Sequence, residues 1–392
     1  MSKSVKTYLK TAAKDYKSRS VNPPVVRAST ILFKTMQELR KHQKDITKRK
    51  DVEHWDYGRQ GTQTTVQLQK LLRGLEEAYQ VFLTPTGFAA VALSIMSICR
   101  PGDEILISDG VYRPTQKLTD DLLKEFKVKA VWYNPNSFDD FKNKITRKTK
   151  LIYVENPGSN TFEMNDLGKI VFLAKSKNIF TAIDNTWATA YFFKPLKLGF
   201  DISITSATKY YSGHSDVMAG KFAVNKKAYD KVWWYNHVSW YRLSSDDAYL
   251  VIWGLRTLDI SLEKHQENAK KIINFLKNQK KIYKILYPYK TSSREFKLLK
   301  KYYSGASGLL SVIIKSKSKN SVYKFVNSLE IFGIGYSWGG FESLAVYTDP
   351  IELGTRRYFK LEKNEHLVRL HIGLEDPKDL INDLKKSLRF VK

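Results

Sequence analysis

The feature that most constrains this chain is the alternation of short apolar runs with helical patterns between residues 62 and 255. Runs typical of strands occur at 80–83, 104–108, 130–133, 151–155, 180–184, 202–206 and 221–224. Helical spacing separates most of them, as in Val66, Leu68, Leu71, Leu72 and Leu75. Strands that alternate with helices form βαβ units, whose strands are parallel and covered on both faces. The sequence therefore predicts an α/β fold with a mostly parallel sheet.

The segments on either side of this region follow different patterns. Residues 1–60 are polar, contain Pro23 and Pro24, and show one short amphipathic helix pattern at 35–43. After Leu255, a helix pattern at 262–279 precedes short strand patterns at 309–314, 333–337 and 367–372 and a helix from Pro377. We therefore expect an N-terminal arm over 1–60, a larger domain over 61–255 and a smaller α+β domain over 256–392.

Composition excludes several classes of protein. Hydrophobic residues make up 42% of the chain, which is enough for a large core and argues against wholesale disorder. The longest apolar run, 88–99, is shorter than the ~20 residues of a membrane-spanning helix, and the N-terminus shows no signal-peptide pattern. The one cysteine, Cys99, cannot form an internal disulfide or a thiolate zinc site. These observations predict a soluble cytoplasmic protein that does not bind membranes.

The net charge raises the question of nucleic-acid binding. Sixty-six Lys and Arg residues against 39 Asp and Glu give a charge of +27. The excess is spread along the chain, and stretches such as 141–150 and 277–301 mix lysine with apolar residues as the solvent faces of amphipathic helices do. No arginine-rich arm, zinc-finger spacing or aromatic RNA-binding signature accompanies it. We therefore do not expect a specific nucleic-acid function.

Several well-known catalytic motifs are absent from the sequence. The segment 213–221, GHSDVMAGK, resembles a phosphate loop, but six residues separate its glycines where four are required. Phe222 also stands where Ser or Thr would bind magnesium. No GxGxxG pattern opens a helix and no HExxH pattern occurs. Nucleotide hydrolysis, nicotinamide-dependent dehydrogenation and metalloproteolysis therefore lack their usual residues.

A lysine at the end of a predicted strand is the first candidate catalytic residue. Lys209 lies in SATKYYSGH, residues 206–214. A lysine amine can form an imine with a carbonyl cofactor when its surroundings depress its ionisation. Ser206 and Thr208 could hydrogen-bond a phosphate. In a chain rich in lysine, an ordinary surface role for Lys209 is the simpler interpretation of this residue taken alone.

An aspartate also ends an apolar strand pattern. Asp184 follows residues 180–183, where a carboxylate is costly unless it is paired. A pyridinium N–H would be a suitable partner, because the ion pair keeps the ring protonated as an electron sink. A helix N-cap or a structural salt bridge would equally explain an aspartate here.

Two further turns join strands to helices. In TPTGFAA, residues 84–90, the helix start and Gly87 could form a cup for a phosphate. Tyr112 follows the strand at 104–108 and could stack on a pyridine ring, although a core tyrosine is equally common. Taken together, these residues suit a pyridoxal phosphate enzyme.

The order of these segments resembles the Cys/Met-metabolism family of fold-type-I pyridoxal phosphate enzymes, which includes the cystathionine lyases and synthases. The resemblance extends over residues 22–391. It is carried by YGRQGTQT (57–64), ENPGS (155–159), IDNTWA (183–188), ATKY (207–210), GHSD (213–216), YSWGGFES (336–343) and RLHIGLED (369–376). Gly61 and Thr62 replace the Asn-Pro-Thr that the γ-synthase and γ-lyase branches usually carry, and those branches tend to lack Trp338. The chain is therefore most similar to the bacterial cystathionine β-lyase branch.

The resemblance implies a role for each candidate residue. Lys209 would hold pyridoxal 5'-phosphate as an imine, Asp184 would pair with its ring nitrogen and Tyr112 would stack on the ring. The phosphate would be bound by Gly87, Phe88, Ser206 and Thr208. The substrate would be bound by Arg369, Ser337 and Trp338, with Arg369 holding its carboxylate in a bidentate geometry that lysine cannot reproduce. Paired with Glu375 or Asp376, Arg369 would instead be structural. Tyr57 and Arg59 would reach the site of a neighbouring subunit, in a homotetramer of two catalytic dimers.

The same resemblance implies a reaction. Lys209, once displaced by the substrate amine, would take the Cα proton of L-cystathionine, and homocysteine would leave from Cβ while pyruvate and ammonia form. Lys117 departs from the family, because β-lyases carry an acid at this position that suits the distal ammonium of cystathionine. A γ-lyase or a cysteine desulfhydrase of broader range on the same scaffold therefore remains an alternative. A basic nucleic-acid-binding protein with vestigial enzyme motifs is a third.

Overall fold

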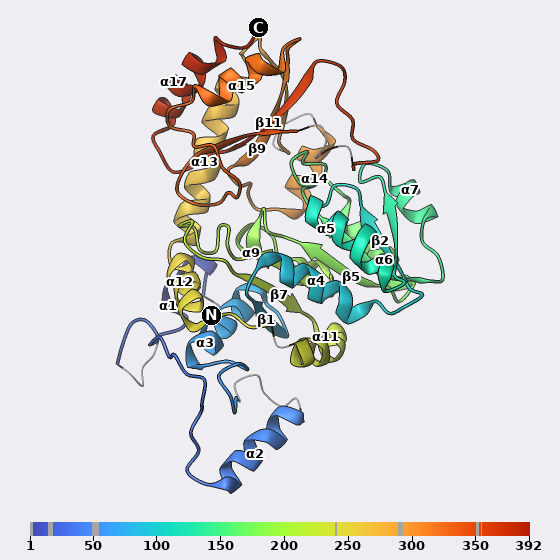
Figure 1. Ribbon diagram of the computed structural model, residues 1–392, viewed down its shortest axis with the longest axis vertical. Helices are drawn as coiled ribbons and strands as arrows, with labels where there is room; N and C mark the ends of the chain where they lie inside the picture. The colour runs from blue at the N-terminus through green and yellow to red at the C-terminus, as the bar shows by residue number, and fades with distance from the viewer. Residues whose placement is uncertain are drawn as a thin grey trace.

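The larger sheet organises the structure, and the smaller sheet lies beyond it along the long axis of the molecule (Figure 1). This computed structural model describes residues 3–14, 19–48, 55–239, 241–288, 293–349, 353 and 355–392. Within these residues, seven strands form the larger sheet and four strands form the smaller one.

The larger sheet is mostly parallel, as the sequence predicts. Its strands are β1 (Gln80–Thr84), β2 (Glu104–Ser108), β3 (Lys129–Tyr133), β4 (Thr149–Glu155), β5 (Phe180–Asp184), β6 (Ile202–Ser206) and β7 (Gly220–Val224), in the order β1-β7-β6-β5-β4-β2-β3. The pairs among β2 to β6 are parallel, whereas β7 runs antiparallel to both β1 and β6. The predicted strand positions are confirmed to within two residues at each end.

Helices cover both faces of this sheet. One face packs on α4 (Gly87–Ile98) and α11 (Lys226–Ser239), and also on the segment formed by α5 (Arg113–Lys117), a π-helix (Leu118–Leu122) and α6 (Leu123–Glu125). The other face packs on α3 (Gln63–Glu76), α8 (Leu167–Ser176) and α12 (Ser245–Leu255). The shorter helices are α7 (Phe138–Asn143), α9 (Thr189–Phe192) and α10 (Pro195–Leu198). The apolar residues of α3 at the predicted helical spacing are buried.

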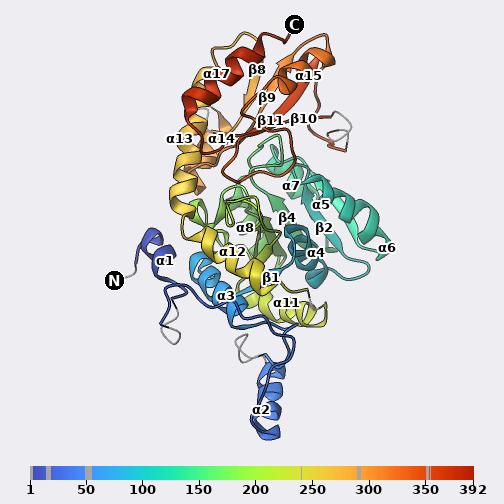
Figure 2. The same cartoon turned by 60° about the vertical axis from the view of Figure 1, so that its left-hand side comes forward.

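A long helix leads from the larger sheet to the smaller one. This helix, α13 (Leu258–Leu276), runs along one side of the molecule in both views (Figures 1 and 2). The antiparallel sheet beyond it has the order β10-β11-β9-β8, with β8 (Ile282–Leu286), β9 (Leu309–Lys315), β10 (Leu344–Thr348) and β11 (Glu365–His371). The other helices of this part are α14 (Arg294–Tyr302), α15 (Lys319–Asn327) and α17 (Pro377–Leu388). This arrangement is the expected α+β architecture, while domain boundaries at residues 60 and 255 stay a prediction.

One predicted strand of this region is wrong. Residues 333–337 form only an isolated bridge, from Gly333 to Leu344, and the strand lies at β10 instead. The backbone leaves the extended region here, because Ser337 has φ 76° and Gly339 has φ 91°. The segment is therefore an irregular loop, which Arg369 of β11 contacts.

The N-terminal segment contains one helix more than predicted. In α1 (Val5–Thr11), Leu9 is fully buried and the Tyr8 hydroxyl donates to the Leu71 carbonyl at 2.9 Å. The expected amphipathic helix is present as α2 (Met36–Thr47), which extends away from the rest of the chain in both views (Figures 1 and 2). No helix within the described residues is long and apolar enough to cross a membrane.

Packing of α3 on the larger sheet generates a test of the fold. Leu72 is fully buried on α3, so Leu72→Ala should lower the free energy of unfolding by about 2–5 kcal/mol. The matched control is Arg73→Ala, which changes an exposed residue of the same helix and should cost less than about 0.5 kcal/mol. Denaturant titration measures both values, and equal losses would contradict this packing.

Candidate active site

The candidate residues gather where the parallel strands end. Glu155 ends β4, Asp184 ends β5 and Ser206 ends β6, and Glu155 and Asp184 are direct neighbours in the sheet register. Lys209 lies in the turn that follows β6. Ligand sites of open α/β sheets form at this edge, because the turns after parallel strands converge there.

Lys209 lies against residues of the smaller sheet and its adjoining loop. Its Nζ donates to the Ser337 hydroxyl and lies 5.5 Å from the centre of the Trp338 ring. Burial, together with the positive charge of Arg369, lowers the pKa of Lys209 from 10.5 to about 8. A substantial fraction of this amine is therefore neutral at physiological pH, as nucleophilic attack on a carbonyl requires.

Asp184 is a carboxylate held in place by the turn that follows it. Its Oδ1 accepts hydrogen bonds from the Thr186 backbone N–H at 2.9 Å and from the Thr186 hydroxyl at 2.6 Å. Burial raises the pKa of Asp184, whereas the Thr186 hydrogen bonds and the positive charge of Lys221 act in the opposite direction. A ring N–H placed here would supply the partner that such a carboxylate needs.

The start of α4 forms a cradle next to the end of β6. A Cβ atom added to Gly87 would overlap the Ser206 side chain, so only glycine permits this close approach. The Thr86 hydroxyl caps the helix by accepting from the Ala89 N–H at 3.0 Å. The first N–H groups of a helix, here those of Gly87 and Phe88, have no partner within the helix and attract anions.

The two hydroxyls expected to bind phosphate have different surroundings. Within the described residues, the Ser206 hydroxyl makes no hydrogen bond and is available to donate. The Thr208 hydroxyl donates to the Ala219 carbonyl at 3.1 Å and accepts from the Ala219 N–H at 2.9 Å. Thr208 would have to release that carbonyl before it could donate to a phosphate oxygen.

Tyr112 directly precedes α5 and lies beside the end of β4. Its side chain is 50% exposed, and its backbone N–H donates to Glu155 Oε2 at 2.6 Å. Burial raises the pKa of Glu155 well above its usual range, and the negative charge of Asp184 raises it further. Glu155 therefore anchors the turn that carries Tyr112, although sequence reasoning assigned it no role.

Arg369 projects from β11 toward the loop that contains Ser337 and Trp338. Its Nη2 donates to the Ser337 carbonyl at 3.0 Å. His371 supports the same loop, because its Nε2 accepts from the Gly339 N–H at 3.1 Å. The two acids that could have paired with Arg369 have other roles, since Glu375 bonds Ser343 and Asp376 caps α17.

Tyr57 and Arg59 lie elsewhere in the chain. Both are exposed, Tyr57 bridges to Thr30, and the Arg59 guanidinium carbon lies 5.1 Å from the centre of the Tyr57 ring. Figure 1 shows this N-terminal segment near α2 and α3, on the far side of the larger sheet from β9 and β11. Within one chain, neither Tyr57 nor Arg59 is among the residues that Lys209 contacts.

Comparison with known proteins agrees with this geometry. The sequence profile of the family described as Cys/Met metabolism PLP-dependent enzymes matches residues 6–389. The chain belongs to this family.

Individual relatives have several different activities. The chain is 35% identical to the cystathionine β-lyase of Haemophilus influenzae, over 95% of this chain and 94% of that protein. It is 33% identical to the L-alanine/L-glutamate racemase of Wolbachia pipientis wMel, over 95% and 93%. The crystal structure of cystathionine γ-synthase from Xanthomonas oryzae pv. oryzae in complex with cystathionine superposes with a TM-score of 0.90 at 26% identity, covering 100% of this chain and 99% of that one.

The family's cofactor is pyridoxal phosphate, and the residues present fit it. The Gly87 cradle faces Ser206, Asp184 offers a half-buried carboxylate for the ring nitrogen, and the Lys209 amine has a lowered pKa. Among the described residues, no group of three or more His, Cys, Asp or Glu side chains could hold a metal ion. The glycine cradle, the carboxylate and the amine suit an organic cofactor that carries a phosphate.

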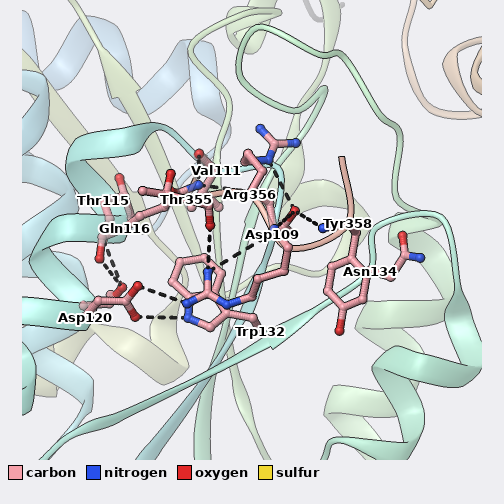
Figure 3. Close-up of polar contacts among 12 residues, drawn as sticks. Asp109, Val111, Thr115, Gln116, Asp120, Trp132, Asn134, Thr355, Arg356 and Tyr358 are labelled. Atoms are coloured by element: carbon pink, nitrogen blue, oxygen red, sulfur yellow. Dashed lines mark hydrogen bonds and ion pairs between the residues drawn. The ribbon is translucent and has the colours of Figure 1, made fainter. Parts of the chain in front are cut away.

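A buried polar network supports the Tyr112 turn. Asp109, which follows β2, accepts from the backbone N–H groups of Arg357 at 2.9 Å and Tyr358 at 3.0 Å. The Arg356 guanidinium, 4% exposed, donates to both Glu163 oxygens at 3.0 and 3.1 Å. Figure 3 shows Asp109 between Arg356 and Tyr358.

A second contact joins the same two segments. The Thr355 hydroxyl donates to Gln116 Oε1 at 2.5 Å, and Gln116 donates to the Val111 carbonyl at 3.2 Å (Figure 3). Residues 355–358 thus hold the turn 109–116, which carries Tyr112. Sequence reasoning missed this network, because residues far apart in the chain form it. The one local sign of this network in the sequence is the pair of adjacent arginines at 356 and 357 beside apolar residues.

The lowered pKa of Lys209 predicts a pH dependence. Covalent attachment of pyridoxal phosphate to the apoprotein should accelerate with rising pH and level off above about 8, because only the neutral amine attacks. Arg369→Met removes a nearby positive charge and should raise this midpoint. Stopped-flow absorbance measures both, and a midpoint near 10.5 in the parent protein would contradict the environment described for Lys209.

The Arg356 network predicts an unequal effect of two adjacent arginines. Arg356→Met leaves Glu163 and Asp109 buried without their cation and should lower the free energy of unfolding by about 3–5 kcal/mol. Arg357→Met is the control, because its side chain is 38% exposed and pairs with Asp120, and it should cost about 1 kcal/mol or less. Denaturant titration distinguishes the two, and equal costs would rule out Arg356 as the centre of the network.

Proposed function

We propose that this protein is a pyridoxal phosphate-dependent cystathionine β-lyase, which converts L-cystathionine to L-homocysteine, pyruvate and ammonia in methionine biosynthesis. The observation that carries the proposal is that Lys209 lies against Ser337, Trp338 and the charge of Arg369, in the turn after the strand that pairs with the one ending at Asp184. Full-length similarity to the Haemophilus influenzae β-lyase supports it. The solved γ-synthase complex with cystathionine supports the same substrate class.

The proposed chemistry needs one residue that can move a proton at Cα. Bound pyridoxal phosphate supplies an electron sink, which makes the Cα proton of an attached amino acid acidic. Lys209, with its lowered pKa, would take that proton as a neutral amine. Asp184 would keep the ring nitrogen protonated through a charged hydrogen bond.

Other residues would bind and orient the substrate and the cofactor. Arg369 would hold the substrate carboxylate, and Ser337 and Trp338 would line the substrate side of Lys209. Tyr112 would stack on the ring. The phosphate would be held by Gly87, Phe88, Ser206 and Thr208.

The proposed assembly follows from the position of Tyr57 and Arg59. These residues would complete the site of a neighbouring subunit, because neither of them contacts the Lys209 of its own chain. The family resemblance supports a homotetramer of two such dimers. We also propose a cytoplasmic location, as the sequence predicts. Within each chain we propose an arm over 1–60, a cofactor domain over 61–255 and a smaller domain over 256–392.

Amino-acid racemisation is a second candidate function. Lys117 is exposed at the end of α5, and its positive charge would disfavour the distal ammonium of a cystathionine molecule that extends toward it. The Wolbachia pipientis relative named as a racemase is nearly as similar to this chain as the β-lyases. Racemisation also begins with removal of the Cα proton but requires no leaving group at Cβ.

Product analysis tests the proposal. The cofactor-loaded protein is incubated separately with L-cystathionine, L-cysteine and L-alanine. Pyruvate with homocysteine from cystathionine is the expected result, and Lys209→Ala should abolish it while circular dichroism stays unchanged. 2-Oxobutyrate with cysteine would move the protein to the γ-lyases, and pyruvate from cysteine alone would indicate a desulfhydrase. D-alanine without any cleavage of cystathionine would replace the proposal with a racemase.

The effect of the Lys117 charge on the KM for each substrate can be measured in the same assay. Lys117→Glu should lower the KM for cystathionine about two- to fivefold and leave that for cysteine unchanged, because only cystathionine carries a distal ammonium. The matched control is Lys124→Glu, which makes the same charge change at an exposed position of α6. Equal effects of the two variants would show that Lys117 does not face the substrate.

A further inference from the structure

A lysine is completely buried inside the larger sheet, at a position to which the chemistry above gives no role. Lys221 lies on β7, between β1 and β6, and its side chain is 0% exposed. Its Nζ pairs with Glu76, whose side chain is also 0% exposed, and donates to the Ser203 carbonyl at 3.3 Å. A buried ion pair is costly to form. Removing only one of its two partners leaves a buried charge without compensation.

Glu76 connects this lysine to the turn that carries Lys209. One of its oxygens accepts from the Tyr211 hydroxyl at 2.9 Å, and the other accepts from the Ser203 hydroxyl at 3.1 Å. Tyr211 is fully buried and lies two residues after Lys209. The position of Tyr211 therefore depends on an acceptor that Lys221 holds in place.

The same tyrosine reaches the segment that follows Asp184. Its hydroxyl oxygen accepts from the Ala190 backbone N–H at 3.2 Å, at the start of α9. Tyr211 thus joins two segments: 184–190, which begins at Asp184, and 206–212, which contains Lys209. One buried cluster thus links α3, β6, β7 and both segments.

We propose that Lys221 is a positioning residue for Lys209 and Asp184, acting through Glu76 and Tyr211. The proposal rests on the function proposed above, because it assigns these two residues to the cofactor. Lys221 neutralises the charge of Glu76 and pairs with its Oε1, the same oxygen that accepts from the Tyr211 hydroxyl, so the lysine fixes the position of that acceptor. The positive charge of Lys221 also lowers the pKa of Asp184, which favours the ionised form that a pyridinium N–H requires.

Three variants distinguish a positioning role of Lys221 from a role in the stability of the fold alone. Lys221→Met leaves Glu76 without its cation. The double variant Lys221→Met/Glu76→Gln removes both charges and keeps an amide oxygen as an acceptor for Tyr211. Tyr211→Phe leaves the ion pair intact and removes only the link to the turns. The control is Lys227→Met, because Lys227 also pairs with a carboxylate, Asp201 at 3.4 Å, but its side chain is 38% exposed and lies on α11.

The measurements report on the bound cofactor as well as on turnover. They are the dissociation constant for pyridoxal phosphate, the pH midpoint of its visible absorption band, kcat and KM, and the thermal midpoint of unfolding. Lys221→Met should weaken cofactor binding about tenfold, shift the band midpoint and lower kcat about 10–100-fold with KM nearly unchanged. Tyr211→Phe should reproduce these changes, the double variant should recover to within about threefold of the parent, and Lys227→Met should match the parent.

Each other outcome has a definite meaning. A Lys221→Met protein with a lower thermal midpoint but parental cofactor binding, absorption band and kcat would show a purely structural role and overturn the proposal. Should that variant not fold, Tyr211→Phe decides, and parental values in it would overturn the proposal equally. The cofactor measurements do not depend on the substrate, so a parent protein that fails to cleave cystathionine would refute the proposed function without deciding the role of Lys221.

Discussion

The carboxyl ends of adjacent parallel strands meet at one edge of the larger sheet, and the rest of the site depends on this constraint. Asp184 and Glu155 end neighbouring strands in direct register, and the Lys209 turn leaves the next strand along. Strand pairing at a spacing of about 4.8 Å fixes the separation of these groups before any side chain is considered. The cradle at Gly87 joins them, because α4 begins against Ser206 with no room for a Cβ atom.

The smaller sheet and its adjoining loop form the opposite wall of the candidate active site and help to set the pKa of Lys209. Arg369 on β11 and the loop with Ser337 and Trp338 lie against Lys209, and the arginine helps to lower the pKa of that amine to about 8. Buried polar clusters then hold the supporting turns: Arg356 with Asp109 and Glu163 below Tyr112, and Lys221 with Glu76 below Lys209. Both clusters use charged groups inside the protein, where a missing partner is most costly.

Much of this arrangement could be predicted from the sequence. The strands at 104–108, 180–184 and 202–206 match the observed strands at both ends, because continuous apolar runs of this length between helical segments have few other interpretations. The segment 333–337 was mispredicted as a strand, since its apolar residues alternate while its glycines and the positive φ of Ser337 turn the backbone. The strand β10 and the helix α1 were missed, because packing against distant residues rather than local pattern stabilises them.

By itself, the sequence determined the alternating pattern that imposes a parallel sheet, the residues at its strand ends, and the similarity that places the chain in its family. It could not determine which charges become buried together. Lys221 and Glu76 are 145 positions apart, and Arg356 and Asp109 are 247 apart, so neither pair leaves a local signal. Nor does composition show that the pKa of Lys209 is lower than that of other lysines, because its desolvation and the neighbouring Arg369 guanidinium arise only when the turn after β6 packs near β11 and its adjoining loop. Those properties belong to the tertiary structure, since burial and proximity of charge are set by packing.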